Sequence, residues 1–305
     1  MSGRSKRVLV TGAGGFIGSA ALALLARQGY AAVGIGRHAP LSIPHDAEWV
    51  TLNLASLEAR NALDSLPTFD TVVHCAAAIP KSFTDDSSRE AGDINAAIDQ
   101  TVIDYCIRQN ARLIYCSGTS VYGLVSNGLI GEEHFLNGAF SPYIQSKILS
   151  ESRIRERLLS YAILRICAPY GTLQSAKTVL KIFIETAIAG GVLYYYGSGS
   201  REQDFVHVRD VAEAMRSAVA RTHVTNTFNI AGGSPISMKD LALTVVAIIG
   251  NPSASVRRSG SDDVQEDYRA RFDISRAKQQ LDWSPKITLQ EGIREWATSM
   301  GARGA

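Results

Sequence analysis

Thr11-Gly-Ala-Gly-Gly-Phe-Ile-Gly18 is the stretch of sequence that decides the fold of this chain. It joins a β-branched run, which predicts a strand at residues 7–11, to an apolar stretch that predicts a helix at residues 19–28. A glycine-rich turn between a strand and a helix is typical of the first unit of a dinucleotide-binding sheet. The stretch therefore predicts both the fold class and a phosphate-binding loop.

The glycines of this loop have distinct physical tasks. Gly12 permits the tight turn, and Gly15 lets backbone N–H groups approach a pyrophosphate. Gly18 lets the helix pack closely on the strand, while the helix N-terminus adds partial positive charge. We expect these glycines, together with Phe16 and Ile17, to contact the cofactor.

The remaining pattern predicts a parallel sheet and a second lobe. In the first half, β-rich runs alternate with helical stretches, which is typical of a sheet with helices on both faces. Further strands are predicted at residues 31–36, 49–52, 71–75, 113–117, 161–166 and 193–196, and helices at 94–109, 141–159, 178–189 and 211–220. We therefore predict an α/β chain with a Rossmann-type, doubly wound parallel sheet and a smaller mixed α/β substrate lobe.

The domain boundaries follow a change of pattern near the middle of the chain. Residues 1–171 are predicted to form the dinucleotide-binding domain, to which residues 204–230 return. Residues 172–203 and 231–305 are predicted to form the substrate-binding lobe. Within that lobe, the polar stretch Ser253–Arg271 predicts a mobile loop or a substrate flap.

Composition narrows the class of protein. A net charge of +2 over 305 residues gives no basic field for nucleic acid. Met1–Arg7 leads directly into the first strand without a signal peptide, and no run of about 20 apolar residues follows, so we expect a soluble cytoplasmic chain. Neither the histidines nor the cysteines show metal-ligand spacing, so no metal site is predicted. Reduced thiols are expected, with a disulfide pair as the alternative, at Cys75, Cys106, Cys116 and Cys167.

The end of the second predicted strand bears on the choice of dinucleotide. NAD-binding chains usually place an acidic residue there, about 20 residues after the loop, to bond the ribose 2′-hydroxyl. In this chain the position is Gly36, followed by Arg37. Without the carboxylate there is no repulsion toward a 2′-phosphate, and the Arg37 guanidinium is a planar donor suited to one. The sequence thus favours NADP(H) over NAD(H); the alternative is a solvated Arg37 in a chain that binds NAD.

Tyr143 and Lys147 stand four residues apart in a predicted helix, so both side chains lie on one face. Ser141 and Pro142 are suited to be the N-cap and the first helical residue, which places the tyrosine in the first turn. A nearby ammonium stabilises a phenolate and lowers the pKa of a tyrosine from its ordinary value of about 10. The pair is therefore predicted to donate or accept a proton near neutral pH.

Ordered motifs along nearly the whole chain resemble those of the extended short-chain dehydrogenase/reductases, in their nucleotide-sugar-modifying branch. They are the glycine loop, Val72-Val-His-Cys-Ala-Ala77, Ser120-Val-Tyr-Gly123, the Tyr143/Lys147 pair, Leu164–Gly171, Asp204–Asp210, Asp273–Ala277 and Leu281–Pro285. The resemblance implies hydride exchange between a nicotinamide and an oxygen-bearing carbon, with Tyr143 moving the proton and Lys147 holding the nicotinamide ribose. It also implies a cofactor contact at Ala76 and a homodimer built from the helices at 94–109 and 141–159.

The chain departs from the family pattern at the catalytic hydroxyl. Relatives commonly carry a catalytic Ser or Thr three residues before Val121, where this chain has Gly118. Alternation along an extended segment sends Ser117 and Thr119 to the same side, so both are candidates, with Thr119 slightly favoured. Ser120 stands where dehydratase relatives carry an acidic residue, so elimination of water is not expected.

Three residues are candidates for binding the substrate. Asn95 aligns with an asparagine that relatives use near the active site, although a structural role is equally open. Gln203 replaces the arginine that commonly contacts the substrate diphosphate, and Arg201 is placed to compensate; alternatively, the substrate lacks a conventional nucleotide diphosphate. Tyr194–Tyr196 could stack on a base or supply one face of a core, and Arg257-Arg258 could meet phosphates or be solvated.

These features lead to one main functional prediction and two alternatives. The main prediction is an NADPH-dependent reductase of a nucleotide-linked keto-sugar, of the 4-keto-6-deoxy type. It follows from the Tyr143/Lys147 pair together with Arg37, because Arg37 favours NADPH and a dissociable, reducing cofactor suits net reduction. The first alternative is a nucleotide-sugar 4-epimerase that retains NAD. The second is a non-catalytic, cofactor-sensing protein, which Gly118 and Gln203 would suit.

Overall fold

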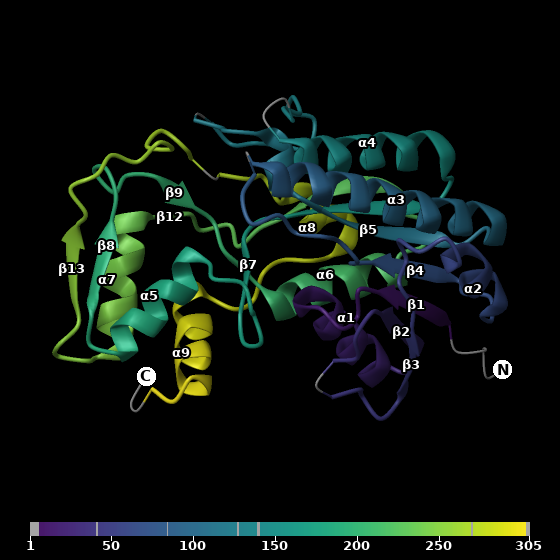
Figure 1. Ribbon diagram of the computed structural model, residues 1–305, viewed down its shortest axis with the longest axis horizontal. Helices are drawn as coiled ribbons and strands as arrows, with labels where there is room; N and C mark the ends of the chain where they lie inside the picture. Colours follow the sequence, from purple (N-terminus) through teal and green to yellow (C-terminus); the bar gives the residue numbers. More distant parts are fainter. Residues whose placement is uncertain are drawn as a thin grey trace.

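The structure is a computed structural model that describes residues 6–40, 42–83, 85–126, 128–138, 141–269 and 271–302. A large parallel sheet with helices on both faces occupies one half, and a smaller group of helices and short strands occupies the other (Figure 1). Of the N-terminal segment considered above, residues 1–5 lie outside the described residues. The two halves correspond to a large and a small lobe.

Seven parallel strands form the main sheet, in the order β11-β6-β5-β4-β1-β2-β3. They are β1 (Arg7–Thr11), β2 (Ala31–Gly36), β3 (Ala47–Thr51), β4 (Thr71–His74), β5 (Arg112–Gly118), β6 (Tyr161–Ile166) and β11 (Asn226–Ile230). The strand order reverses at β1, which has β2 on one side and β4 on the other. Doubly wound sheets bind their ligands at such a switch point, outside the carboxyl ends of the strands. The predicted Rossmann-type, doubly wound parallel sheet is confirmed.

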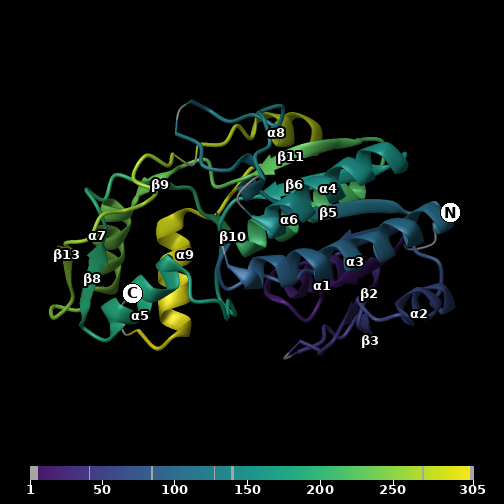
Figure 2. The ribbon, with the colours of Figure 1, turned by 45° about the horizontal axis from the view of Figure 1, so that its top comes forward.

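Helices cover both faces of this sheet (Figures 1 and 2). The helices of the chain are α1 (Phe16–Arg27), α2 (Ala59–Ser65), α3 (Asp86–Gln109), α4 (Pro142–Arg157), α5 (Val179–Ile188), α6 (Val208–Ala220), α7 (Met238–Ile249), α8 (Ser275–Leu281), α9 (Leu289–Ser299) and the 3-10 helix η1 (Thr119–Tyr122). The pair α3 and α4 packs on one face, and the pair α1 and α6 packs on the other. Because both faces are covered, the interior of β1 is a continuous apolar run, with residues 8–10 fully buried.

The small lobe contains three short strand pairs and a core of its own. Its strands pair as β13 (Ser255–Arg258) with β8 (Val192–Tyr195), β12 (Ile236–Ser237) with β9 (Glu202–Gln203), and β10 (Val206–His207) with β7 (Pro169–Tyr170). Helices α5, α7 and α9 bury an apolar cluster that includes Phe183, Leu241 and Trp296. This cluster is separate from the two clusters that flank the main sheet.

Two stretches differ from the sequence-based expectation. Ser253–Arg271 is not a loop throughout, because its residues Ser255–Arg258 form β13 and pair in parallel with β8. Residues 272–283, expected in the small lobe, instead contribute Phe272, Ile274 and Trp283 to the core of the large lobe. Their few apolar side chains are widely spaced among charged residues, so the local pattern does not reveal which lobe they cover.

A buried ion pair fixes α4 on the sheet. Arg165 Nη2 of β6 lies 2.6 Å from Glu151 Oε2 of α4, and Arg165 Nε donates to the other carboxylate oxygen at 3.0 Å. The side chains are 3% and 0% exposed. Burial by itself raises the pKa of Glu151, but the hydrogen bonds and charge of Arg165 outweigh it and hold that pKa below its ordinary value. Buried charges are stable only when they are paired in this way. The pair therefore restricts how far α4 can shift on the sheet.

Replacing Arg165 with Met is expected to lower the free energy of unfolding by about 3 kcal/mol, because the buried Glu151 loses its two-bond partner and keeps only Arg155 and Ser117. Urea unfolding followed by circular dichroism measures this. The double variant Arg165→Met/Glu151→Leu should recover most of the loss. As a matched control, Arg157→Met breaks a surface pair with Asp104 and should cost about 1 kcal/mol or less. Equal losses for Arg157→Met and Arg165→Met would contradict the role of burial.

Candidate active site

The glycine loop connects β1 to α1 as the sequence predicts, and its glycines are sterically required. A Cβ atom on Gly18 would lie 2.2 Å from the Gly12 carbonyl oxygen, and one on Gly14 would lie 2.1 Å from the His38 carbonyl oxygen. Gly14 and Gly15 are exposed, and Gly15 is the N-cap of α1 without a side chain to occupy the first N–H groups. An open backbone at the positive end of a helix fits a pyrophosphate.

The segment that follows β4 lies against this loop. The Ala76 N–H donates to Thr11 Oγ1 at 3.2 Å, and a Cβ atom on Gly12 would lie 2.6 Å from the Ala76 nitrogen. The Asn95 side-chain amide accepts from the Ala78 N–H at 2.7 Å and donates to the Ala78 carbonyl at 2.9 Å. Asn95 is fully buried, and its two hydrogen bonds to Ala78 hold the backbone beside the loop.

Arg37 lies directly after β2, and its side chain is exposed. A Cβ atom on the preceding Gly36 would lie 3.1 Å from the Trp49 ring. The indole therefore borders the space in which NAD-binding chains usually keep a carboxylate. A ribose bound there would meet an aromatic ring and an accessible guanidinium instead of an acidic group.

The Tyr143/Lys147 pair lies in the first two turns of α4. Ser141 is the N-cap, with its hydroxyl accepting from the Ile144 N–H at 3.4 Å, and Pro142 is the first helical residue, as the sequence predicts. Tyr143 is half-buried, whereas Lys147 is 3% exposed. The ordinary rules of helix capping thus deliver both side chains to one place beside the sheet.

Lys147 is held by a buried polar network centred on the Asp99 carboxylate. Lys147 Nζ donates to the Tyr115 hydroxyl at 3.0 Å and lies 3.8 Å from Asp99 Oδ2. The same Oδ2 accepts from the Tyr115 hydroxyl at 2.5 Å and from Ser150 Oγ at 2.7 Å. The other oxygen, Oδ1, lies 2.9 Å from His74 Nε2. The network joins α3, β4, β5 and α4 around one charge.

The network continues to the glycine loop. With neutral His74, Nε2 donates to Asp99, and Nδ1 accepts from the Thr11 hydroxyl at 2.6 Å. Thr11 in turn accepts from the Ala76 N–H. Burial by itself raises the pKa of Asp99, but the charge of Lys147 and the hydrogen bond from His74 outweigh it and lower that pKa. One ionised carboxylate thus orients Lys147 and the end of β1 together.

The expected direction of the Tyr143 pKa is wrong. Burial raises the pKa of Tyr143 above its ordinary value, the charge of Lys147 lowers it by a smaller amount, and the charge of Asp99 raises it again. The four-residue spacing predicted that Lys147 lies near Tyr143, but it did not predict the buried carboxylate of Asp99 beside them. Tyr143 is therefore protonated at neutral pH in this arrangement and is suited to donate a proton.

The candidate hydroxyls have different surroundings. Ser117 Oγ donates to Glu151 Oε1 at 2.7 Å inside the buried α4–β6 contact. Thr119 begins η1, so the chain is no longer extended there and the expected alternation with Ser117 does not apply. A Cβ atom on Gly118 would meet nothing closer than Ser120 Oγ at 3.4 Å. The space beside Gly118 is therefore open enough for a hydroxyl group, and Ser120 borders it.

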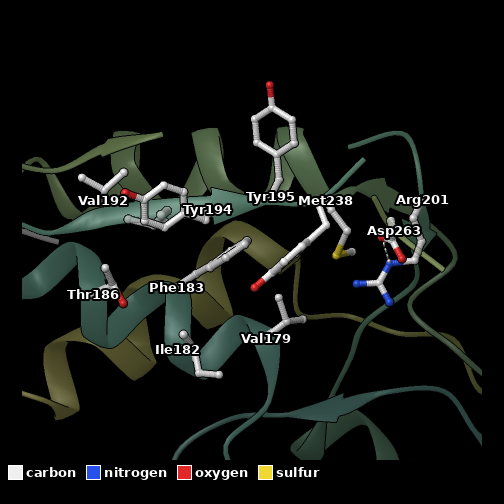
Figure 3. A pocket seen from close by; sticks show the side chains of 12 residues that line it. Val179, Ile182, Phe183, Thr186, Val192, Tyr194, Tyr195, Arg201, Met238 and Asp263 are labelled. Carbon is white, nitrogen blue, oxygen red and sulfur yellow. Dashed lines mark ion pairs between the residues drawn. The ribbon is translucent and has the colours of Figure 1, made fainter. Parts of the chain in front are cut away.

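A cavity of about 460 Å³ lies in the small lobe, beside β8 and α5. Its mainly apolar wall includes Val179, Ile182, Phe183, Tyr194, Tyr196 and Met238. Figure 3 shows the Tyr194 ring lying along the strand above Phe183, while the Tyr195 ring points away. At one end, Arg201 forms an ion pair with Asp263, with Nε and Oδ2 3.0 Å apart. The predicted tyrosine triplet thus divides between the cavity and the opposite face of the strand.

The two polar substrate candidates are both engaged in local contacts. Arg201 Nη1 donates to Gln265 Oε1 at 2.9 Å in addition to its pair with Asp263. Gln203 Nε2 donates to the Asp204 carbonyl at 3.1 Å. Arg201 lines the cavity, whereas Gln203 does not. Arg257 and Arg258 end β13 with exposed side chains, as expected for a solvated pair.

Sequence reasoning missed Asp99 and Tyr115, whereas His74 is the buried, hydrogen-bonded histidine that its apolar strand predicts. The signal available for Asp99 was its position within the buried stripe of α3, four residues after Asn95, where a carboxylate needs a buried partner. The sequence near Asp99 does not identify that partner, because the side chains that contact Asp99 come from β4, β5 and α4. Within the described ranges, no cluster of three His, Cys, Asp or Glu side chains could hold a metal ion. None of the described helices combines the length and apolar character that crossing a bilayer requires.

Comparison with known proteins places this geometry in a family. The sequence pattern of the NAD dependent epimerase/dehydratase family matches residues 8–231. A putative UDP-glucose 4-epimerase of Methanocaldococcus jannaschii is 29% identical over 94% of this chain and 96% of its own length. A dTDP-4-dehydro-6-deoxy-D-allose reductase of a Streptomyces species is 28% identical over 96% of this chain and 95% of its own length. The crystal structure of Thermotoga maritima UDP-glucose 4-epimerase with UDP-glucose superposes with a TM-score of 0.84 at 24% identity, covering 96% of this chain and 98% of that one.

These matches, the doubly wound sheet and the glycine loop define a class of NAD-dependent enzymes that includes epimerases and dehydratases. The chain belongs to the NAD dependent epimerase/dehydratase family. The resemblance noted in the sequence is thereby confirmed.

Replacing Asp99 with Asn is expected to lower the free energy of unfolding by about 3–5 kcal/mol at neutral pH, because Lys147 loses its buried counter-charge. The folded-state pKa of Asp99 is lower than its unfolded value of about 3.9. Its ionised form therefore stabilises the fold above that value, and the contribution is lost as the pH falls through the folded-state pKa.

Urea unfolding at a series of pH values measures the effect. The difference between the parent chain and Asp99→Asn should be full at neutral pH and shrink below about pH 4. The matched control, Asp104→Asn, lies on the same helix in a surface pair with Arg157 and should change stability by about 1 kcal/mol or less. A difference that grows toward acid pH would refute the assigned network.

Proposed function

We propose that this chain is a nucleotide-sugar 4-epimerase that retains NAD. The observation that carries the proposal is the end-to-end similarity to a putative UDP-glucose 4-epimerase together with the Tyr143/Lys147 pair in the first turns of α4. This favours the alternative raised from the sequence over its main prediction. Neither Thr119 nor Ser120 is acidic, which argues against a dehydratase, since elimination needs an acid and a base.

In this proposal the chain moves a proton while the cofactor moves a hydride. The bound nicotinamide supplies the acceptor and then the donor of that hydride. The Tyr143 oxygen takes the proton of the sugar hydroxyl only as a phenolate, so the phenol that burial keeps protonated must first lose its proton, a loss that the charge of Lys147 favours. The resulting phenol returns the proton at the end of the cycle. Lys147 is held in place by Tyr115 and Asp99, and its charge opposes the effect of burial on the Tyr143 pKa.

The remaining candidates take positioning and binding roles. Gly12, Gly15 and Gly18 shape the pyrophosphate site, with Phe16, Ile17 and Ala76 as neighbours. Thr119 is the favoured partner hydroxyl, because Ser117 is engaged by Glu151. Asn95 acts through the backbone it holds, rather than by touching the substrate.

The cavity beside β8 suits the base of the nucleotide. Phe183 and Tyr194 offer aromatic rings in its wall, and Arg201 supplies a cation at one end. Aromatic stacking combined with a guanidinium is a common way to hold a base and its phosphates. Gln203 has neither the charge nor the position for this task, so Arg201 is the proposed diphosphate contact.

The second candidate function is an NADPH-dependent keto-sugar reductase. The observation in its favour is the exposed Arg37 beside a β2 end that has no carboxylate, where Trp49 borders the space instead. A reduction also suits a Tyr143 whose pKa is raised, because the protonated phenol is the donor. The Streptomyces reductase is a relative over nearly the whole chain.

We also propose a homodimer formed by α3 and α4. The two helices cover one face of the sheet together, and they expose the apolar side chains of Ile107 and Leu149. Paired helices from two copies would bury these residues in a four-helix contact. Sedimentation should give twice the mass of 32.8 kDa, and Leu149→Glu should shift the chain toward the monomer.

Tyr143→Phe is expected to lower turnover of a UDP-hexose by about 100-fold or more, because the proton-transfer group is lost. Dinucleotide binding, followed by fluorescence titration, should stay within about threefold of the parent chain, since the ring remains in place. Tyr30→Phe is the matched control and should leave both quantities unchanged. Full turnover by Tyr143→Phe would overturn the assigned role, and binding without any turnover in the parent chain would favour the cofactor-sensing alternative.

Cofactor stoichiometry separates the two enzymatic functions. A 4-epimerase should convert its nucleotide sugar over many turnovers without net loss of reduced cofactor at 340 nm, because the hydride returns to the same carbon. A reductase should consume one NADPH for each 4-keto sugar reduced. If Arg37 does bind a 2′-phosphate, Arg37→Ala should weaken NADPH about tenfold and leave NADH unchanged. Equal losses for both dinucleotides would rule out that contact.

A further inference from the structure

Two of the four free cysteines lie side by side at the carboxyl edge of the sheet. Cys75 and Cys116 each follow the paired residues His74 and Tyr115 of neighbouring strands β4 and β5. Their sulfur atoms are 3.3 Å apart, within the distance of a hydrogen bond between the two thiols. Both side chains are half-buried, whereas Cys106 and Cys167 are buried. The arrangement brings together two thiols from positions 41 residues apart in the sequence.

Neighbouring strands give these thiols a spacing that a disulfide can bridge. Adjacent strands lie about 4.8 Å apart, and disulfides join Cα atoms about 4.4–6.8 Å apart. Closing the bond requires the sulfurs to approach from 3.3 Å to about 2.05 Å. Rotation of the two side chains and a small shift of the segment after β4 can supply this movement.

We propose that Cys75 and Cys116 are a redox-active dithiol, which a hydroperoxide oxidises to a disulfide that weakens dinucleotide binding. The thiolate of one cysteine attacks the peroxide oxygen and becomes a sulfenic acid, releasing water after protonation. The second thiol attacks this sulfur, the S–S bond forms, and the sulfenic oxygen leaves as a second water. Two thiols lose two electrons and two protons, and one hydrogen peroxide is reduced to two waters.

The consequence for the dinucleotide follows from the contacts of the segment after β4. The Cys75 N–H donates to the Thr11 carbonyl at 3.2 Å, and the Ala76 N–H donates to the Thr11 hydroxyl. Ala76 also lies against Gly12, where there is no room for even one additional carbon atom. Movement of Cys75 toward β5 therefore changes the backbone that supports the phosphate loop.

The environment of Cys75 also slows its reaction with peroxide. The hydrogen bond shared with Cys116 and burial raise the pKa of Cys75 well above its ordinary value, while the charge of Lys147 acts in the opposite sense. Cys75 is a thiol rather than a thiolate at neutral pH, and only the thiolate attacks peroxide efficiently. The first attack on peroxide is therefore slow, and the adjacent second thiol decides that the sulfenic acid becomes a disulfide and not a more oxidised form.

The test treats the full chain with hydrogen peroxide and counts thiols after unfolding. The number of titratable thiols should fall from four to two, the mass should fall by two hydrogen atoms, and peptide mapping should show a Cys75–Cys116 link that dithiothreitol removes. Cys116→Ser should form no intramolecular link. The matched control Cys106→Ala should still form it, because Cys106 is buried elsewhere in α3.

Dinucleotide affinity is then measured on the oxidised and the reduced chain. We expect at least tenfold weaker NAD binding after oxidation, restored by dithiothreitol, and no such change for peroxide-treated Cys116→Ser. A link that forms without any change in affinity would overturn the coupling to the cofactor site. Over-oxidation of single cysteines without a link would overturn the dithiol itself. Thiol counts and mass do not depend on turnover, so they remain decisive whichever sugar reaction the chain performs.

Discussion

The buried carboxylate of Asp99 is the constraint on which the arrangement of this site depends. It has no exposed surface, so it is stable as a charge only because Lys147, Tyr115, Ser150 and His74 surround it. Each of these partners belongs to an element that contributes to the site. Satisfying one charge therefore fixes the relative positions of α3, α4, β4 and β5.

This requirement links two functions that are far apart in the sequence. Through His74 and Thr11, the carboxylate reaches the end of β1, from which the phosphate loop begins. Through Tyr115 it reaches Lys147, one turn of helix after Tyr143. In the function proposed above, a dinucleotide held by the loop and a proton donor held by α4 would both be positioned by the same buried charge. Buried polar networks of this kind specify geometry because a partly satisfied network is costly.

The small lobe follows a different principle. Its core is apolar, and it presents an aromatic-lined cavity whose one cation, among the lining residues, is already paired with Asp263. Aromatic faces tolerate several bases and sugars, whereas the network in the large lobe tolerates few changes. Under the function proposed above, this division would let one proton-transfer centre serve different nucleotide sugars.

The sequence by itself determined the sheet, the phosphate loop and the first turn of α4. These features depend on glycine sterics, alternation of strand and helix patterns, and capping by Ser141 and Pro142, all of which act between near neighbours. Only the tertiary structure decided the direction of the Tyr143 pKa, the engagement of Ser117 by Glu151 and the return of Phe272 to the large lobe. The reason is that burial and charge pairing are set by residues that approach from distant strands, and no local pattern records which of them meet.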